Sequence, residues 1–408
     1  QKNPQATFPA LALAWVISNE AFFNVSAIDF LKLRLSRGMN GNRNIGIYAS
    51  LATLGSILDY DEGVRTGVYN STLANPDLRW EKTLSNDIGL DMELFQSRLA
   101  LSIDAYVSKT TDLLMNRQLP IITGFSSITT NLGQLNNRGL NISVNTVNVK
   151  NKNFEWESSL VFSLNRNKIV KLFGDMGTYK LLGQTHTGEL PDFTNGWFPG
   201  QASDVVWNYN VLGVWQTGEK DGAVVYGLAP GDWKVKDVND DKKLLQFDDK
   251  QFIGHTIPQY NIGFRNEFTI LKNLYASVFL RADLGFIRSI PRLTTNNSVL
   301  DRQNIWSWPY WSLNNPSNEF ARYIFPDNLG QYEGGITIYK KTSFVRVQDI
   351  SLSYSFTQNW IHRVRLRDLR VFGAINNFLT FTKWPGFDPE SGMMPMPRVF
   401  TIGVNASL

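Results

Sequence analysis

Four side chains between residues 237 and 248 have the types and spacing of a calcium-binding loop. Asp237, Asn239, Asp241 and Asp248 would occupy positions 1, 3, 5 and 12 of such a loop, where carboxylate and amide oxygens coordinate the ion. Lys242 stands at position 6, which is normally glycine. The spacing therefore predicts a possible calcium site, and the alternative interpretation is an acidic surface turn without an ion.

Aromatic side chains form a second group, since sugar rings can stack on aromatic faces. The candidate substrate contacts are Trp197, Trp207, Trp306, Trp308 and Tyr310. Alternate residues of an extended run share a face, so we expect Trp306, Trp308 and Tyr310 to project together, toward a lumen or a partner. Trp311 would point the opposite way and pack into its own loop. The alternative is that all of these rings only pack loops together.

Several kinds of chemistry are excluded or unsupported. The chain has no cysteine, which removes disulfides, thiolate metal sites and a cysteine nucleophile. Its three histidines, His186, His255 and His362, form no pair with ligand spacing, and no Ser/His/Asp arrangement is visible. We therefore expect no catalytic residues and no enzymatic role. The net charge of +4 gives no basic stripe for nucleic acid.

The elements that must position these residues are strands, because apolar and polar residues alternate with period two along most of the chain. In residues 81–94 and 99–108 one stripe is apolar and the other polar. We expect about eleven strands, near residues 7–18, 27–38, 80–94, 98–111, 136–149, 154–168, 258–270, 273–286, 343–356, 366–378 and 398–408. Most exceed the usual length of about 5–6 residues for a soluble strand.

Short and long connections alternate between these strands. The long ones lie near 39–79, 112–135, 169–257, 287–342 and 379–397. Long outer loops and short periplasmic turns are typical of bacterial outer-membrane barrels, whose strands face lipid on one side and a polar lumen on the other. The fold class is therefore all-β, a transmembrane antiparallel β-barrel in the outer membrane. A soluble sandwich or β-helix is the alternative, but neither has this loop pattern.

Eleven strands leave an open edge, which lipid does not tolerate because unpaired backbone groups are costly there. Barrels of about 22 strands are plugged outer-membrane transporters. We therefore expect residues 1–408 to be the C-terminal half of such a barrel, with the plug and the first half encoded upstream.

The alternation also predicts which side chains face which solvent. The residues expected to face lipid are Leu99, Ile103, Phe400, Ile402 and Val404. The residues expected to face the lumen are Asp87, Asp91, Asp104 and Asn405.

Several motifs in order along the chain resemble those of SusC/RagA-type TonB-dependent transporters. Residues 75–83 (NPDLRWEKT) resemble the signature NPDLKWE, and residues 41–46 (GNRNIG) resemble GNQxIG. Residues 377–383 (NFLTFTK), 385–390 (PGFDPE) and 397–403 (PRVFTIG) look like the closing motifs of that family. Many members of that family carry the sequence DxNxDG at the place of residue 237, which favours the calcium interpretation slightly.

The resemblance implies a SusC-like transporter of a Bacteroidota-type bacterium. It implies a plug in the missing N-terminal part that the TonB–ExbB–ExbD complex pulls, a SusD-like surface lipoprotein as a lid, and oligosaccharide or peptide as substrate. Membrane lipid and lipopolysaccharide would surround the barrel. Two alternatives remain open: a siderophore or cobalamin receptor without a lipoprotein lid, and a passive porin or surface glycan-binding protein without energy coupling.

Overall fold

The computed structural model describes residues 5–42, 50–59, 65–290, 307–322, 330–356, 366–392 and 394–407. Among these residues, no helix has the length and hydropathy that a membrane-crossing helix requires.

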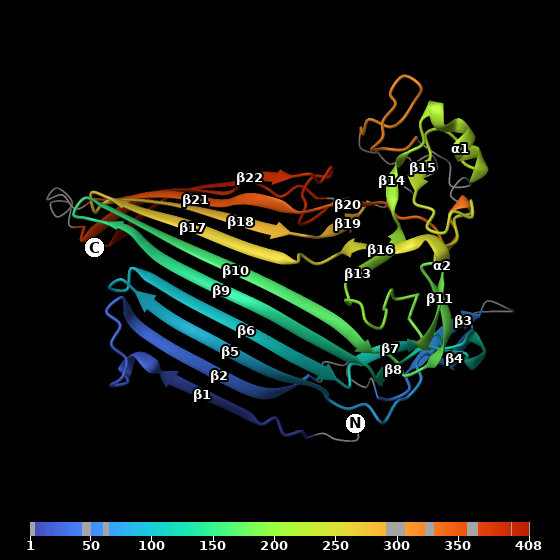
Figure 1. The fold of residues 1–408 in the computed structure, drawn as a ribbon, viewed down its shortest axis with the longest axis horizontal. Helices are drawn as coiled ribbons and strands as arrows, with labels where there is room; N and C mark the ends of the chain where they lie inside the picture. Colours follow the sequence, from blue (N-terminus) through green and yellow to red (C-terminus); the bar gives the residue numbers. More distant parts are fainter. Residues whose placement is uncertain are drawn as a thin grey trace. The chain divides into compact units, whose positions relative to one another are not determined.

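The principal sheet has eleven strands whose order in the sheet follows the sequence (Figure 1). They are β1 (Ala10–Val16), β2 (Ile28–Asn42), β5 (Glu81–Leu94), β6 (Leu99–Thr111), β9 (Gln134–Lys150), β10 (Phe154–Lys171), β17 (Tyr260–Ile270), β18 (Leu274–Leu284), β21 (Phe344–Phe356), β22 (Asp368–Thr382) and β23 (Val399–Ser407). This confirms the eleven predicted strands. β2 and β22 extend four residues beyond the predicted ends, 38 and 378, on the side of the long loops.

Two of the short connections are tight turns with left-handed backbone. Leu271 and Lys272 both have positive φ, 51° and 67°, which is the twist that two-residue hairpin turns need to match their strands. Between β5 and β6 the turn uses Phe95, Gln96 and Ser97, all with positive φ. The Ser97 amide donates to the Asp29 carboxylate at 2.9 Å. These turns fix the register of the strands that they join.

The long connections contain small elements of their own, all two-stranded. These are β3 (Leu54–Asp59) with β4 (Arg65–Asn70), β7 (Leu114–Gln118) with β8 (Ser127–Asn131), β11 (Met176–Leu181) with β12 (Gln184–Glu189), β13 (Val205–Tyr209) with β16 (Lys250–His255), β14 (Val211–Val214) with β15 (Trp233–Val235), and β19 (Ile287–Ser289) with β20 (Tyr339–Lys341). Two short helices, α1 (Lys220–Val225) and α2 (Gln246–Asp249), and 3-10 turns at Ile17–Asn19, Ile121–Thr123 and Thr217–Glu219 complete the described elements.

The chain divides into two compact units. The first contains residues 1–150, 157–176 and 189–203, and the second contains residues 151–156, 177–188 and 204–408. In the first unit a small core consists of Met115, Ile169 and Leu172. In the second, a larger core of loop residues is built around Trp233, Tyr209 and Tyr332.

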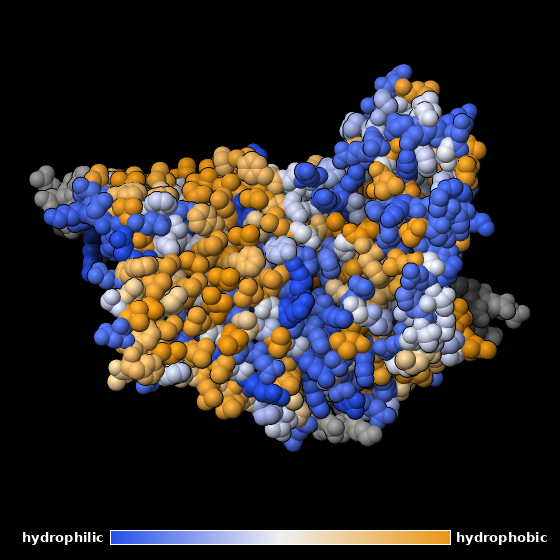
Figure 2. Space-filling view, in the orientation of Figure 1, coloured by the Kyte–Doolittle hydropathy of each residue, from blue (hydrophilic) through white to orange (hydrophobic). Residues whose placement is uncertain are grey.

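The principal sheet has two chemically opposite faces. On one face of the first unit, Leu13, Leu35 and Ile88 occupy one cross-strand row and are all exposed. In the second unit, Phe400, Ile402 and Val404 are 69%, 86% and 61% exposed. Figure 2 shows a continuous apolar surface over much of the strands, whereas the surface over the loop regions mixes hydrophilic and apolar patches. Such exposure is unfavourable in water and normal against lipid.

The opposite face carries the polar stripe. Arg34 forms ion pairs with Asp91 and Asp104 there, and Asp87 lies on the same side because it alternates with the exposed Ile88. The predicted separation of apolar and polar residues onto opposite faces of the sheet is therefore confirmed for these strands. In β23 the same alternation places Asn405 opposite Val404.

Candidate functional site

The polar face of the first unit is organised by one arginine. The Arg34 guanidinium lies 2.8 Å from Asp91 on β5 and 2.8 Å from Asp104 on β6. Ser102 donates to the same Asp91 carboxylate at 2.8 Å. These groups are about one-third exposed, so they are not sealed in a core within this chain.

A glycine makes this arrangement possible. Gly89 is the backbone partner of both Arg34 and Asp104. A Cβ at this position would lie 2.5 Å from the Asp104 carboxylate and 2.6 Å from the Arg34 guanidinium carbon. The missing side chain therefore lets the arginine cross β5 and reach two strands at once. The cluster ties β2, β5 and β6 together on the polar face.

The loops of the second unit fold around their own aromatic core. Trp233, Tyr209 and Tyr332 are nearly fully buried. The Tyr209 hydroxyl donates to the Leu244 carbonyl at 2.9 Å, and the Tyr332 hydroxyl donates to the Trp233 carbonyl at 2.6 Å. Burial raises the pKa of both phenols, so they remain neutral donors. We call this region, residues 204–257 with 307–322 and 330–342, the loop body.

Trp308 and Tyr310 of the predicted aromatic cluster lie within the loop body. Trp308 stacks on Phe320 with ring centroids 5.6 Å apart and meets Tyr310 edge-on at 6.3 Å. Both side chains are half-buried, and their mutual contact agrees with the expectation that they share a side. Trp306 lies outside the described residues. Trp311 differs from expectation: it packs on the loop-body core and donates to Gln216 at 3.1 Å, thus contacting a different loop.

Trp197 and Trp207 are half-buried and have structural contacts. Trp197 forms a backbone bridge with Asp192 and packs on the core of the first unit. Trp207 donates its indole N–H to the Lys250 carbonyl at 3.2 Å, and the Lys250 ammonium lies 5.3 Å from its ring centroid. Substrate contact by either residue stays a prediction.

The acidic residues of the predicted calcium loop bind protein groups. The Asp237 carboxylate accepts hydrogen bonds from the backbone of Asp240 and Lys242 and from the Tyr226 hydroxyl. The Asp241 carboxylate accepts from the Lys243 amide and the Asn239 side chain.

The fourth predicted ligand, Asp248, is buried and lies 2.6 Å from the Lys180 ammonium. Among the described residues, no group of three or more His, Cys, Asp or Glu side chains is arranged to hold a metal. Protein groups therefore already bind these carboxylates. The calcium site stays a prediction.

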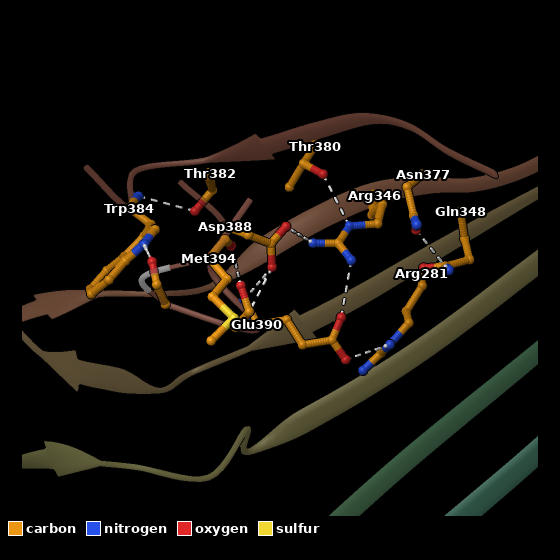
Figure 3. Close-up of polar contacts among 12 residues, drawn as sticks. Arg281, Arg346, Gln348, Asn377, Thr380, Thr382, Trp384, Asp388, Glu390 and Met394 are labelled. Carbon is orange, nitrogen blue, oxygen red and sulfur yellow. Dashed lines mark hydrogen bonds and ion pairs between the residues drawn. The ribbon is translucent and has the colours of Figure 1, made fainter. Parts of the chain in front are cut away.

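One buried charge network was not anticipated from the sequence. Arg346 on β21 is 1% exposed, and its guanidinium donates to Asp388, to Glu390 at 3.0 Å and to Thr380 at 3.0 Å (Figure 3). Arg281 on β18 binds Glu390 at 3.0 Å from the other side. The PGFDPE motif of residues 385–390 was visible in the sequence, but its partners were not.

The network neutralises two arginines that lie side by side in the sheet. Arg281 and Arg346 are direct cross-strand partners, and like charges at such positions repel. Carboxylates from the loop that follows β22 neutralise both guanidinium groups, and Asp283 adds a further contact to Arg281 at 2.6 Å. The arginine pair thereby clamps that loop, residues 383–392, onto the polar face of the sheet.

Comparisons with known proteins agree with this architecture. A family model described as TonB dependent receptor-like, beta-barrel matches residues 1–378. TonB-dependent receptor P3 of Formosa agariphila is 31% identical, over 99% of this chain and 42% of its own length. TonB-dependent receptor SusC of Bacteroides thetaiotaomicron is 29% identical, over all of this chain and 40% of its own length.

Among solved structures, the RagAB peptide transporter is similar in fold, with a TM-score of 0.73 at 22% identity, covering 97% of this chain and 43% of that chain. The chain thus spans about two fifths of the length of the curated relatives that it matches. These relatives are receptors and not enzymes, in line with the expectation of no catalytic role, and the resemblance to SusC-type transporters is confirmed. The chain therefore belongs to the TonB-dependent receptor-like β-barrel family of the bacterial outer membrane.

Proposed function

We propose that this chain supplies barrel wall and surface loops to a TonB-dependent importer of oligosaccharides or peptides that works with a SusD-like surface lipoprotein as its lid. The observation that carries the proposal is the loop body, which has its own core of Trp233, Tyr209 and Tyr332. Loops of this length are usually functional. A loop region with a core of its own presents a fixed surface, which lowers the entropy lost when a partner or substrate binds.

The polar and aromatic groups that the chain offers support this substrate class. Trp308 and Tyr310 form a half-buried aromatic pair on the loop body, suited to stacking on sugar rings or on aromatic and aliphatic peptide side chains. The charged polar face with Arg34, Asp91 and Asp104 offers hydrogen-bond donors and acceptors along the lumen. The solved transporter RagAB is described as a peptide transporter, and SusC is a curated relative.

Energy coupling would reside in a plug outside this chain, pulled by TonB with ExbB and ExbD. The experiment is purification of the full-length protein from native outer membranes in mild detergent, with mass spectrometry of co-purifying proteins, glycans and peptides. We expect a lipoprotein at equal stoichiometry and a bound oligosaccharide or peptide. An intact barrel that carries a metal chelate and no lipoprotein would favour the siderophore or cobalamin receptor. Uptake that persists in cells without TonB would favour a passive porin.

A further inference from the structure

The exposed face of β2, β5, β6 and β9 changes character near the long loops. The loop-side end of each strand carries one exposed cation on the apolar face: Arg37, Lys82, Lys109 and Arg138. The register places Arg37 and Arg138 in one cross-strand row, through Asn86 and Val107. Lys109, two residues beyond Val107, lies in the next row toward the loops. All four share the side of the exposed Leu35 and Ile88.

These four cations have no counter-charge within the described part of the chain. None of them takes part in an ion pair there, and on the loop-side half of these strands no acidic residue shares their face. Arg34, on the opposite face of β2, is by contrast held by two carboxylates. These exposed cations are therefore available to an anion from outside the protein.

An apolar groove ends beside Arg37, one of these four cations. It has a volume of about 440 Å³ and is lined by Leu11, Leu13, Leu35, Ile88, Ala105 and Val107, with Arg37 and Asn86 at one end. Ala105 is the backbone partner of Ile88 and provides the short side chain between larger ones. The groove thus joins an elongated apolar surface to a site for negative charge.

We propose that this face binds one lipid of the outer leaflet whose headgroup carries phosphate groups, with an acyl chain in the groove and the phosphate groups held by Arg37, Lys109 and Arg138. The long loops mark the cell-surface end of the strands, so the cations lie at the level of the outer-leaflet headgroups. Arginine binds phosphate through two parallel hydrogen bonds. The proposal rests on the outer-membrane location and is independent of the imported substrate.

A lipid fits this face better than a protein strand does. Strands that complete the barrel pair with the backbone edge of β1 and do not cover its outer face. A lumenal substrate lies on the other side of the sheet, where Arg34 is found. The groove therefore faces the membrane. The cations near the end of the groove favour the anionic lipids of that membrane.

The test compares the wild-type full-length protein with variants, each purified from outer membranes. Native mass spectrometry measures how much phosphorylated lipid each protein retains. The triple variant Arg37→Gln, Lys109→Gln, Arg138→Gln should lose at least about fivefold of the co-purified phosphorylated lipid. Ala105→Phe, which fills the groove without changing its charge, should also lower the amount of co-purified phosphorylated lipid. A matched triple variant replaces the exposed Lys152, Lys272 and Lys341 by Gln and should retain the wild-type amount. Undiminished retention by the first triple variant, or by Ala105→Phe, overturns the proposal.

A second measurement needs no variant and guards against failure of the variants to fold. The wild-type protein is reconstituted in phosphatidylcholine vesicles with and without lipid A, and its thermal unfolding is recorded. Lipid A should raise the unfolding temperature. Inorganic phosphate at equal concentration should leave it unchanged, because it cannot occupy the groove. An equal effect of inorganic phosphate, or no effect of lipid A, would overturn the assignment.

Discussion

Arg346 is the residue whose replacement should have the largest consequence for stability. Arg346→Met leaves the buried Asp388 carboxylate without its cation. Removing one partner of a buried ion pair typically costs about 3–5 kcal/mol. We expect a loss of that size in denaturant unfolding and faster proteolysis within residues 383–392. Arg367→Met removes an exposed arginine near the far end of β22 and serves as the control. Equal stability of the two variants would show that the network does not hold the loop.

Asp249 should give the loop body a pH dependence. Its carboxyl is fully buried, and burial raises its pKa despite hydrogen bonds from the Val238 and Leu245 amides. A raised pKa means that the folded state binds the proton more readily than the unfolded state, so stability falls as pH rises from the ordinary value of about 4 through the raised one.

Asp249→Asn should therefore flatten the slope of loop-body stability against pH, measured by hydrogen exchange between about pH 4 and 7. The exposed Asp221→Asn is the comparison and should keep the wild-type slope. An unchanged slope in Asp249→Asn would mean that another group titrates.

At the scale of single strands, β23 offers a direct test of sidedness. Val404 is 61% exposed on the apolar face, and Asn405 lies on the opposite one. A cation facing lipid at the bilayer midplane costs about 2–4 kcal/mol, whereas changes facing the lumen cost less. Val404→Arg should therefore lower the yield of heat-modifiable folded barrel more than Asn405→Arg does. Equal yields would contradict the register.

The strands of the principal sheet could be predicted because each carries a period-two pattern over ten or more residues. The small hairpins could not, because they are short and their burial depends on distant segments. β14 and β15, for instance, pair Val211 with Val235, and both strands lie within the predicted long loop 169–257. The clamp on residues 383–392 was invisible for the same reason: only the register of β18 with β21 places Arg281 beside Arg346.

The candidate site was predictable only in its residue types. Trp308 and Tyr310 were found from composition, and their contact accompanies a tight turn at Pro309, where the Tyr310 amide donates to the Trp308 carbonyl at 2.8 Å. The core contact of Trp311 was missed because its partner Gln216 lies 95 residues away. The acidic loop illustrates the converse. Spacing suggested a metal site, while backbone amides at each turn also satisfy the Asp237 and Asp241 carboxylates.

The aromatic pair on the loop carries the prediction about transport. Trp308→Ala with Tyr310→Ala should reduce uptake of the imported oligosaccharide or peptide several-fold while barrel assembly is unchanged, because stacking on aromatic faces is lost. The control is Tyr354→Ala with Phe356→Ala, a ring pair at the short-turn end of β21. Normal uptake by the first variant would make Trp308 and Tyr310 structural.

For the whole molecule, the two faces and the loop body imply separable stabilities. The sheet is held by continuous strand pairing and by lipid, whereas the loop body depends on its own core. Trp233→Ala should cost the loop body about 3–5 kcal/mol, as expected for removal of a buried tryptophan. The barrel should still migrate as a folded, heat-modifiable band, because no strand of the principal sheet contains this residue.

If the loop body seats the lid, Trp233→Ala should also abolish co-purification of the lipoprotein. Surface-exposed Leu212→Ala in the neighbouring strand β14 keeps the core and should retain the partner. Loss of the partner together with the folded barrel would show that the two parts are one cooperative unit. Retention of the partner by a barrel whose loop body has become protease-sensitive would place the lid on other loops, such as those between β2 and β5.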